Sequence, residues 1–255
     1  MKKVLLILVA AFAAQINIAQ NKELKDSPID FNVDIKTNHL WRGLIITDKP
    51  MVAVFTSIKL NKSGSFTTGF WGGMSFSNES DGTSYKEINY YVQYAKNGLS
   101  LALWDLYNTR GAVNPDVWDY DKETSGHLLD LRTSYNFGES FPLTLEADVL
   151  LYGGKDGQYD QNIDFEQRYS TYVQVSYPLV KDAKVNLDGF VGAGFSLNGD
   201  THLYGDGQEN FDLVNVGLIA SKTVMLGNYS LPVSTTVLWN PSLKYARVQL
   251  AFSLF

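Results

Sequence analysis

The sequence of 255 residues contains no cysteine, so disulfides, thiolate metal sites and a lipoprotein anchor are excluded. Histidine is scarce too: the three histidines, His39, His127 and His202, are widely separated in the chain. A zinc site that needs several such ligands is therefore not expected. We predict no metal and no cofactor.

Long hydrophobic runs are also missing, because no apolar run near 18 residues follows Ala14. Helical membrane spans are therefore not expected. The run Val4 to Ala14 is short, follows Lys2 and Lys3, and precedes small or polar residues through Gln20. This order is typical of a secretory signal peptide, with an uncleaved anchor as the alternative. We expect residues 1–20 to form the signal peptide.

Basic charge is in short supply in the remaining chain. Removing Lys2 and Lys3 leaves 19 basic against 27 acidic residues, a formal net charge of −8. Phosphate binding needs a basic surface, so we expect no nucleic-acid partner.

Alternation of apolar and polar residues runs through almost the whole chain after the signal, while helical stripes are missing. Each alternating segment is at least as long as the 9–11 residues that a tilted strand needs to cross a bilayer, whereas strands of soluble sandwiches are shorter. The pattern predicts twelve strands, at 29–41, 50–60, 65–77, 85–96, 98–108, 126–137, 142–153, 167–180, 184–197, 211–225, 229–239 and 243–255.

The two faces of these strands differ in chemistry. One carries apolar residues such as Val33, Leu131 and Val191, and the other carries charges. In a secreted sandwich the apolar face is the core; in a membrane barrel it meets lipid, and the charged face lines the lumen. The predicted lumen-lining charges are Asp34, Lys36, Lys59, Glu87, Asp130, Arg132, Glu146, Asp148, Arg168, Asp188 and Arg247.

Connection lengths separate these two architectures. Joins of three or four residues such as 61–64 and 226–228 alternate with longer ones such as 109–125 and 198–210. Aromatic residues such as Tyr177 and Trp239 lie near strand ends, as in an interfacial girdle. We therefore predict an all-β protein: an antiparallel transmembrane β-barrel of about 12 strands over residues 29–255, with periplasmic termini and a short periplasmic lead at 21–28. Pro232 is expected at a strand start or a bulge.

Two stretches resemble a known family. The first is Thr37-Asn38-His39-Leu40-Trp41-Arg42-Gly43, which resembles the Ser-Asp-Tyr-x-Phe-Arg-Gly stretch near the start of TorF family porins. The second is Gly69-Phe70-Trp71-Gly72-Gly73, which is similar to that family's Gly-x-Trp-x-Ser segment. Leu44-Ile45-Ile46-Thr47 departs from the polar stretch that usually follows. The resemblance implies a bacterial outer-membrane barrel of porin type and no catalytic residues.

The inward charges are mixed, six acidic and five basic, and allow two interpretations. A water-filled pore would let small polar solutes diffuse passively between opposing charged walls. A lumen closed by ion pairs would instead make a structural or adhesive barrel, whose acidic loops bind cells or matrix outside. Passive diffusion is the predicted function, with outer-membrane lipid, the barrel-assembly machinery and small polar solutes as partners.

Several residues near strand ends could have other roles. Arg42 is expected at the loop rim, either snorkelling at the interface or pairing with loop carboxylates. Ser125 and His127 are close enough in sequence to suggest a rim hydrolase, but no orienting third residue is identifiable, and the protein is not expected to be an enzyme. Asp119-Tyr120-Asp121 and Gly205-Asp206-Gly207 faintly resemble calcium loops without the full ligand spacing, so solvated loops are favoured.

The chain ends on an alternating strand whose last residue is Phe255. A terminal phenylalanine resembles the signal read by the barrel-assembly machinery. Its parity is opposite to that of Leu254 and the apolar face, so we expect Phe255 to turn outward at the periplasmic rim; a bulge is the alternative.

Overall fold

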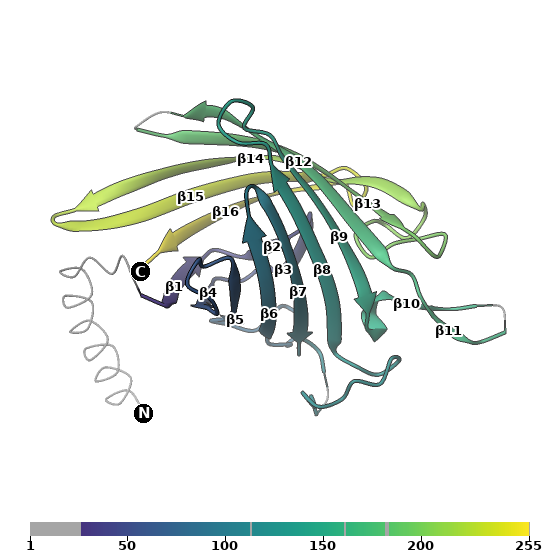
Figure 1. Ribbon diagram of the computed structural model, residues 1–255. Helices are drawn as coiled ribbons and strands as arrows, with labels where there is room; N and C mark the ends of the chain where they lie inside the picture. The colour runs from purple at the N-terminus through teal and green to yellow at the C-terminus, as the bar shows by residue number, and fades with distance from the viewer. Residues whose placement is uncertain (1–26, 113, 161, 182–183, 255) are drawn as a thin grey trace, which may run out of the picture.

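The computed structural model describes residues 27–112, 114–160, 162–181 and 184–254, and these form a closed antiparallel β-barrel (Figure 1). Its 12 wall strands follow the order β1-β16-β15-β14-β13-β12-β9-β8-β7-β6-β5-β4, so each strand pairs with its neighbours along the wall and β1 closes on β16. The predicted fold is confirmed. The predicted signal peptide and Phe255 lie outside the described residues.

The wall strands agree closely with the predicted segments. They are β1 (Ile29–Lys36), β4 (Met51–Lys59), β5 (Phe66–Ser75), β6 (Lys86–Lys96), β7 (Leu99–Asn108), β8 (His127–Asn136), β9 (Thr144–Tyr152), β12 (Ser170–Lys181), β13 (Asn186–Ser196), β14 (Phe211–Leu226), β15 (Tyr229–Asn240) and β16 (Tyr245–Ser253).

Smaller elements lie in the connections. A hairpin of β2 (His39–Trp41) and β3 (Leu44–Thr47) follows β1, and a turn of 3-10 helix at Gly154–Asp156 precedes a second hairpin of β10 (Gly157–Tyr159) and β11 (Phe165–Gln167). Within the described residues, no helix is long and apolar enough to cross a membrane. The prediction of one strand over 29–41 is wrong, because β1 ends at Lys36 and the chain then turns into β2.

The wall is apolar outside and polar inside. On β7, Leu99, Leu101 and Leu103 face outward and are 39–44% exposed, while Ala102 between them faces the lumen and is buried. The same exposure recurs on other strands, as at Val191 with 47% and Val248 with 54%. A soluble sandwich would bury this face, because soluble monomers rarely expose large contiguous apolar patches. The closed wall therefore fits an outer-membrane barrel.

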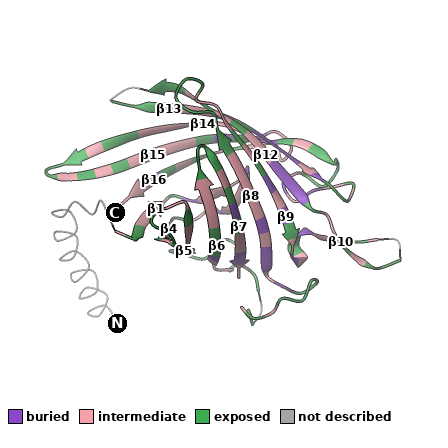
Figure 2. Ribbon diagram, in the orientation of Figure 1, coloured by how far each residue is buried: buried purple, intermediate pink, exposed green. Residues whose placement is uncertain are grey.

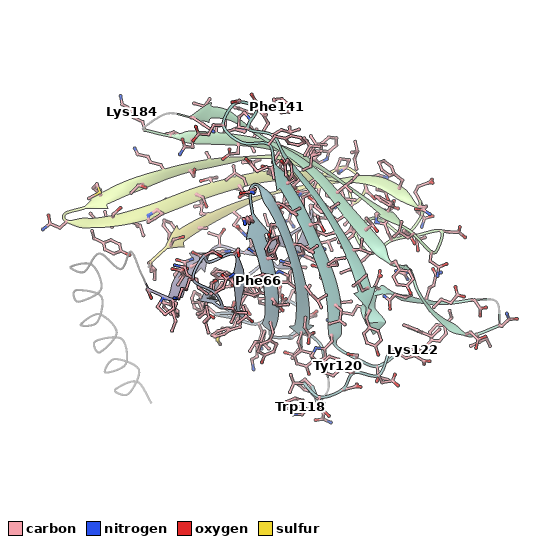
Figure 3. The ribbon with its side chains drawn as sticks, in the orientation of Figure 1. Phe66, Trp118, Tyr120, Lys122, Phe141 and Lys184 are labelled. Carbon is pink, nitrogen blue, oxygen red and sulfur yellow. The ribbon has the colours of Figure 1, made fainter. Side chains whose placement is uncertain are left out.

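The two ends of the barrel differ. One end, here the turn end, has short connections, including those that carry Phe141 and Lys184 (Figure 3). The opposite end, the loop end, carries the long connections; Trp118, Tyr120 and Lys122 mark the one between β7 and β8. β1 begins and β16 ends at the turn end, as the alternating connection lengths predict (Figure 1).

The seam between β1 and β16 is short. Only three residue pairs join the two strands, from Asp34↔Ser253 to Lys36↔Ala251. Beyond them Thr37 N–H donates to Leu250 O at 3.0 Å, and the Asn38 side chain donates to Val248 O at 2.9 Å. The contact between the two segments thus continues past the last paired residues, first through the backbone and then through the Asn38 side chain. From this point the β2–β3 hairpin enters the barrel.

Buried residues gather in the loop half of the barrel, on β7, β8 and β12 (Figure 2). They form one apolar cluster, against which Trp41 and Leu44 of the hairpin pack. The barrel is therefore filled on its loop side. The cluster consists of Leu106, Leu128, Leu150, Tyr172, Tyr204 and Val214.

Candidate functional site

The β2–β3 hairpin crosses the lumen on a two-residue turn, Arg42-Gly43. Both residues have positive φ, 49° and 84°, as tight two-residue hairpin turns require. A Cβ on Gly43 would lie 2.0 Å from Val214 O of β14, so only glycine fits there. The Gly43 carbonyl accepts hydrogen bonds from the Tyr245 hydroxyl at 2.6 Å and the Asn240 amide at 3.3 Å. The tip of the hairpin is thus anchored to β15 and β16 and lies close against β14.

Arg42 joins this tip to β8 and β9 through a buried ionic cluster. Its Nη2 lies 2.9 Å from Asp130 Oδ2 and 2.5 Å from Asp148 Oδ2, and its Nη1 donates to the Tyr204 hydroxyl at 2.9 Å. Both carboxylates are at most 1% exposed, and the guanidinium also lies 4.7 Å from the Trp41 ring centre. Such a cluster is costly to break, because each charge depends on the others for the stabilisation that water would give.

The expected position of Arg42 at the loop rim is therefore wrong. Arg42 is 7% exposed inside the barrel, and its partners Asp130 and Asp148 belong to the wall, not to the loops. The physical reason is the turn at Arg42-Gly43, which reverses the chain inside the lumen and does not extend β1 to the rim.

The loop between β13 and β14 also folds inward and supports the cluster. It contributes Tyr204, which is fully buried, and His202, whose Nε2 lies 3.1 Å from Asp212 Oδ2. His202 Nδ1 accepts the Tyr204 backbone N–H at 3.2 Å, so the proton is on Nε2. Burial lowers the pKa of His202, which agrees with this neutral imidazole.

Three cavities lie one after another along β7. The first, about 560 Å³, lies at the loop end beside Tyr107 to Ala112. The second, about 280 Å³, lies between the hairpin and the wall and reaches Trp104, Leu106 and Asn108. The third, about 260 Å³, lies toward the turn end beside Ser100, Ala102 and Trp104.

These cavities share lining residues. The first and second are both lined by Asn108, Gly126 and Lys155, and the second and third by Trp104 and Arg132. We call the three together the β7 passage. These are three separate cavities in a row along the wall, from the loops into the turn half of the barrel.

Polar groups line the middle of the β7 passage. The Glu87 carboxylate accepts hydrogen bonds from the side chains of Tyr85, Asn89 and Asn108 at 2.8–3.2 Å. Lys155, at the start of the loop between β9 and β12, donates to Asn108 O at 3.0 Å. Burial lowers the pKa of Lys155, against the opposing effect of Glu87. A carboxylate and an amine therefore face the same cavity.

Ten of the eleven predicted lumen charges lie on wall strands. Arg168 does not: it follows β11 and precedes β12, and its backbone N–H donates to Asp156 O at 3.0 Å. The structure brings Asp130, Arg132 and Asp148 together around Arg42. Glu146 neighbours this cluster, because it interacts with both Asp148 and Arg42. The remaining six are Asp34, Lys36, Lys59, Glu87, Asp188 and Arg247.

Some of these remaining charges have local partners. Lys36 pairs with Asp34 at 3.4 Å, and Arg247 lies 3.6 Å from Asp48 at the foot of the hairpin. Lys59 donates to Ser27 O at 3.0 Å near the turn end. These charges are not among the residues that line the β7 passage.

The outer rim holds the histidine that suggested a hydrolase. Asp105 does orient His127, since its Oδ1 lies 2.6 Å from His127 Nδ1. His127 Nε2, however, lies 3.0 Å from Val117 O, and the Ser125 hydroxyl donates to Asp119 O at 2.8 Å. Nε2 is therefore not aimed at the Ser125 hydroxyl, as a serine–histidine pair would require.

The loop carboxylates suggested as calcium ligands bind their own backbone. Asp119 Oδ1 accepts the Asp121 N–H, Asp121 Oδ1 accepts the Glu123 N–H, and Asp206 Oδ1 accepts the Gln208 N–H. In the part of the chain that the structure describes, no group of three or more histidines and carboxylates is placed to hold a metal ion.

Sequence reasoning missed the hairpin and the residues that receive it, Tyr204, Asn240 and Tyr245. One signal was present: the apolar pairs Leu40-Trp41 and Leu44-Ile45 flank a dipeptide that ends in glycine, a tight-turn pattern. Nothing local marks Tyr204, because its role depends on a loop that packs across the lumen.

No family model and no curated protein matches this chain. Among solved structures the chain is similar to CdiB from Acinetobacter baumannii, at 13% sequence identity and a TM-score of 0.32, over 88% of this chain and 46% of that one. The chain thus spans less than half the length of that structure. A likeness this low carries no argument about function.

Proposed function

We propose that this chain is an outer-membrane barrel through which small polar solutes diffuse passively, and that they use the β7 passage. The observation that carries the proposal is the sharing of lining side chains from one cavity to the next, Asn108 and Lys155 above and Trp104 and Arg132 below. A bacterial outer membrane as the location is part of the proposal, supported by the apolar outer face of the wall.

The hairpin supports a limit on solute size. It fills the centre of the loop half, with Trp41 and Leu44 packed on the buried cluster, so the passage is confined to one side. Its cavities of about 260–560 Å³ are lined by amide, hydroxyl and charged groups as well as indole rings. Such a lining favours small polar solutes over large or apolar ones.

Membership of the porin-type TorF family remains a proposal as well. It is supported by the Arg42-Gly43 dipeptide of the resemblance, because these two residues hold the hairpin tip across the lumen. No catalytic activity is proposed, in keeping with the orientation of His127 Nε2 toward Val117 O.

Ion conductance in planar lipid bilayers tests the proposal. Ala102 is buried, faces the lumen and lines the third cavity, so Ala102→Phe should obstruct the passage. Thr236→Phe is the matched control, because Thr236 faces the lumen from β15 and lines none of the three cavities. We expect discrete conductance steps for the unmodified protein and for Thr236→Phe, and at least a severalfold smaller step for Ala102→Phe. Equal steps for all three would refute the route, and a silent unmodified barrel would refute the channel.

A closed structural barrel is the second candidate, and the buried Arg42 cluster favours it. If the hairpin acts as a permanent plug, the unmodified barrel is silent, whereas a barrel in which residues 38–49 are replaced by a short glycine-serine linker conducts. Asp148→Asn should accompany this replacement, because Asp148 would otherwise be left as a buried charge without Arg42.

A further inference from the structure

We propose that the third cavity of the β7 passage is a binding site for small zwitterionic solutes of the α-amino-acid type, in which Arg132 binds the carboxylate and Glu146 binds the ammonium group. The inference rests on the proposed passage and names the solutes that it selects. Both side chains line this cavity, together with Gln93, Ser100 and Ser134.

Arg132 presents a fixed guanidinium with two open nitrogens. Its Nε donates to Asp130 Oδ2 at 2.7 Å, and its guanidinium carbon lies 4.2 Å from the centre of a Trp104 ring. These two contacts set the plane of the group. No acceptor among the described residues takes a hydrogen bond from Nη1 or Nη2, and the side chain is 29% exposed. A planar fork held in this way suits a carboxylate, which can accept two parallel hydrogen bonds.

Glu146 supplies the opposite charge without neutralising Arg132. Register places Arg132 opposite Asp148 and Glu146 opposite Ser134, so Arg132 and Glu146 are diagonal neighbours on one face of the wall. Their Cα atoms are therefore separated by roughly 7–8 Å. Among the described residues no cation lies within ion-pair distance of the Glu146 carboxylate. Its neighbour Asp148, with which it interacts, is the carboxylate that pairs with Arg42.

A cavity that holds one cation and one anion apart matches a solute that carries both charges. A simple anion would bind Arg132 but would be repelled by Glu146 and Asp148. A simple cation would be repelled by Arg132. An α-amino acid carries its carboxylate and its ammonium group on the same carbon and satisfies both residues at once. The same reasoning predicts discrimination against neutral solutes, which leave both charges dependent on water alone.

Four isosteric solutes separate these contributions: L-alanine with both charges, L-lactate with the carboxylate only, L-alaninamide with the ammonium only and L-lactamide with neither. Binding to the purified full chain in detergent micelles can be followed by saturation-transfer nuclear magnetic resonance. For the unmodified protein we expect L-alanine to bind at least tenfold more tightly than L-lactamide.

The variants assign each charge. Arg132→Gln should weaken L-alanine and L-lactate about tenfold and leave L-alaninamide no weaker, whereas Glu146→Gln should weaken L-alanine and L-alaninamide but not L-lactate. Arg132→Lys keeps the charge but loses the fork, so its L-alanine affinity should lie between those of Arg132→Gln and the unmodified protein. Arg247→Gln is the matched control, because Arg247 faces the lumen outside the β7 passage, and it should change nothing.

The inference is overturned if L-lactamide binds as tightly as L-alanine, or if Arg132→Gln leaves both carboxylate solutes unaffected while its thermal unfolding matches that of the unmodified protein. Bilayer conductance distinguishes this failure from failure of the channel. A barrel that conducts but shows no preference for zwitterions refutes only the proposed binding site. A silent barrel that binds L-alanine through Arg132 refutes only diffusion through the β7 passage.

Discussion

Replacing Arg42 by methionine removes the charge at the hairpin tip while keeping an apolar side chain of similar length. Asp130 would retain the Arg132 Nε–H as a donor at 2.7 Å. Asp148 would keep the Thr133 backbone N–H at 3.0 Å and its neighbour Glu146, but it would lose its 2.5 Å contact with Arg42, its only cationic partner among the described residues. The damage should therefore fall mainly on Asp148.

The magnitude follows from the burial of the groups. Breaking a buried ion pair from one side costs about 3–5 kcal/mol, because the remaining charge has neither water nor a partner. We expect Arg42→Met to lower the free energy of unfolding by about that amount at neutral pH. The Arg247–Asp48 pair, 3.6 Å apart with side chains 38% and 55% exposed, provides the contrast. Arg247→Met should lose no more than about 1 kcal/mol.

The two carboxylates should respond differently to the loss of Arg42. Asp148→Asn in the Arg42→Met background should recover at least about 2 kcal/mol, since it removes the isolated buried charge. Asp130→Asn in the same background should recover little, because Asp130 still has Arg132 and the change also takes a partner from Arg132.

Urea unfolding of the protein in phospholipid vesicles, followed by tryptophan fluorescence, measures these differences. A loss below about 1 kcal/mol for Arg42→Met would show that the cluster is not what holds the hairpin. Equal recovery from Asp130→Asn and Asp148→Asn would show that the charges are shared differently from the arrangement described.

Three further predictions concern the hairpin and the loop that packs on it. Gly43→Ala should lower the free energy of unfolding by about 2 kcal/mol or more in the same assay, because the added Cβ would lie 2.0 Å from Val214 O. Gly227→Ala is the control: Gly227 also has a positive φ, but an added Cβ would meet nothing within 4 Å, so the loss should be only about 1 kcal/mol. Equal losses for the two variants would exclude a steric role for the hairpin tip. Tyr245→Phe removes the 2.6 Å hydrogen bond to Gly43 O and should lower the free energy of unfolding by about 1 kcal/mol, whereas an unchanged midpoint would mean that Asn240 alone anchors the tip. Burial lowers the pKa of His202 in the folded state. Its contribution to stability is therefore fully present above the unfolded-state pKa of about 6.5 and is lost as the pH falls through the folded-state pKa. His202→Gln should flatten the pH dependence of the unfolding midpoint below about pH 6.5, and a pH profile identical to that of the unmodified protein would contradict this role of His202.

Much of the wall could be predicted from sequence because its determinants are local. Alternation with period two places Leu101 and Val191 on one face and Arg132 and Asp148 on the other, whichever architecture forms. Turn residues such as Asn97-Gly98 mark where the strands reverse. Strand number, length and connection lengths therefore followed from patterns that span only a few residues.

The filling of the lumen could not be predicted in this way. Arg42 and Asp130 are separated by 88 positions, and Arg42 and Tyr204 by 162. Their contact exists only because the wall has closed and the hairpin has turned inward. The same long-range dependence explains why Arg168 was misassigned, since alternation continues from β11 into β12 across a short irregular stretch at Arg168 and Tyr169.

The sequence by itself determined that this chain forms long antiparallel strands with one apolar and one polar face, because alternation and turn chemistry are written residue by residue. Only the tertiary structure decided which face looks outward, that a hairpin occupies the loop half of the barrel, and that the β7 passage remains beside it. Those features depend on closing 12 strands on one another, which brings Arg42 on the hairpin to Asp130 and Asp148 on the opposite wall.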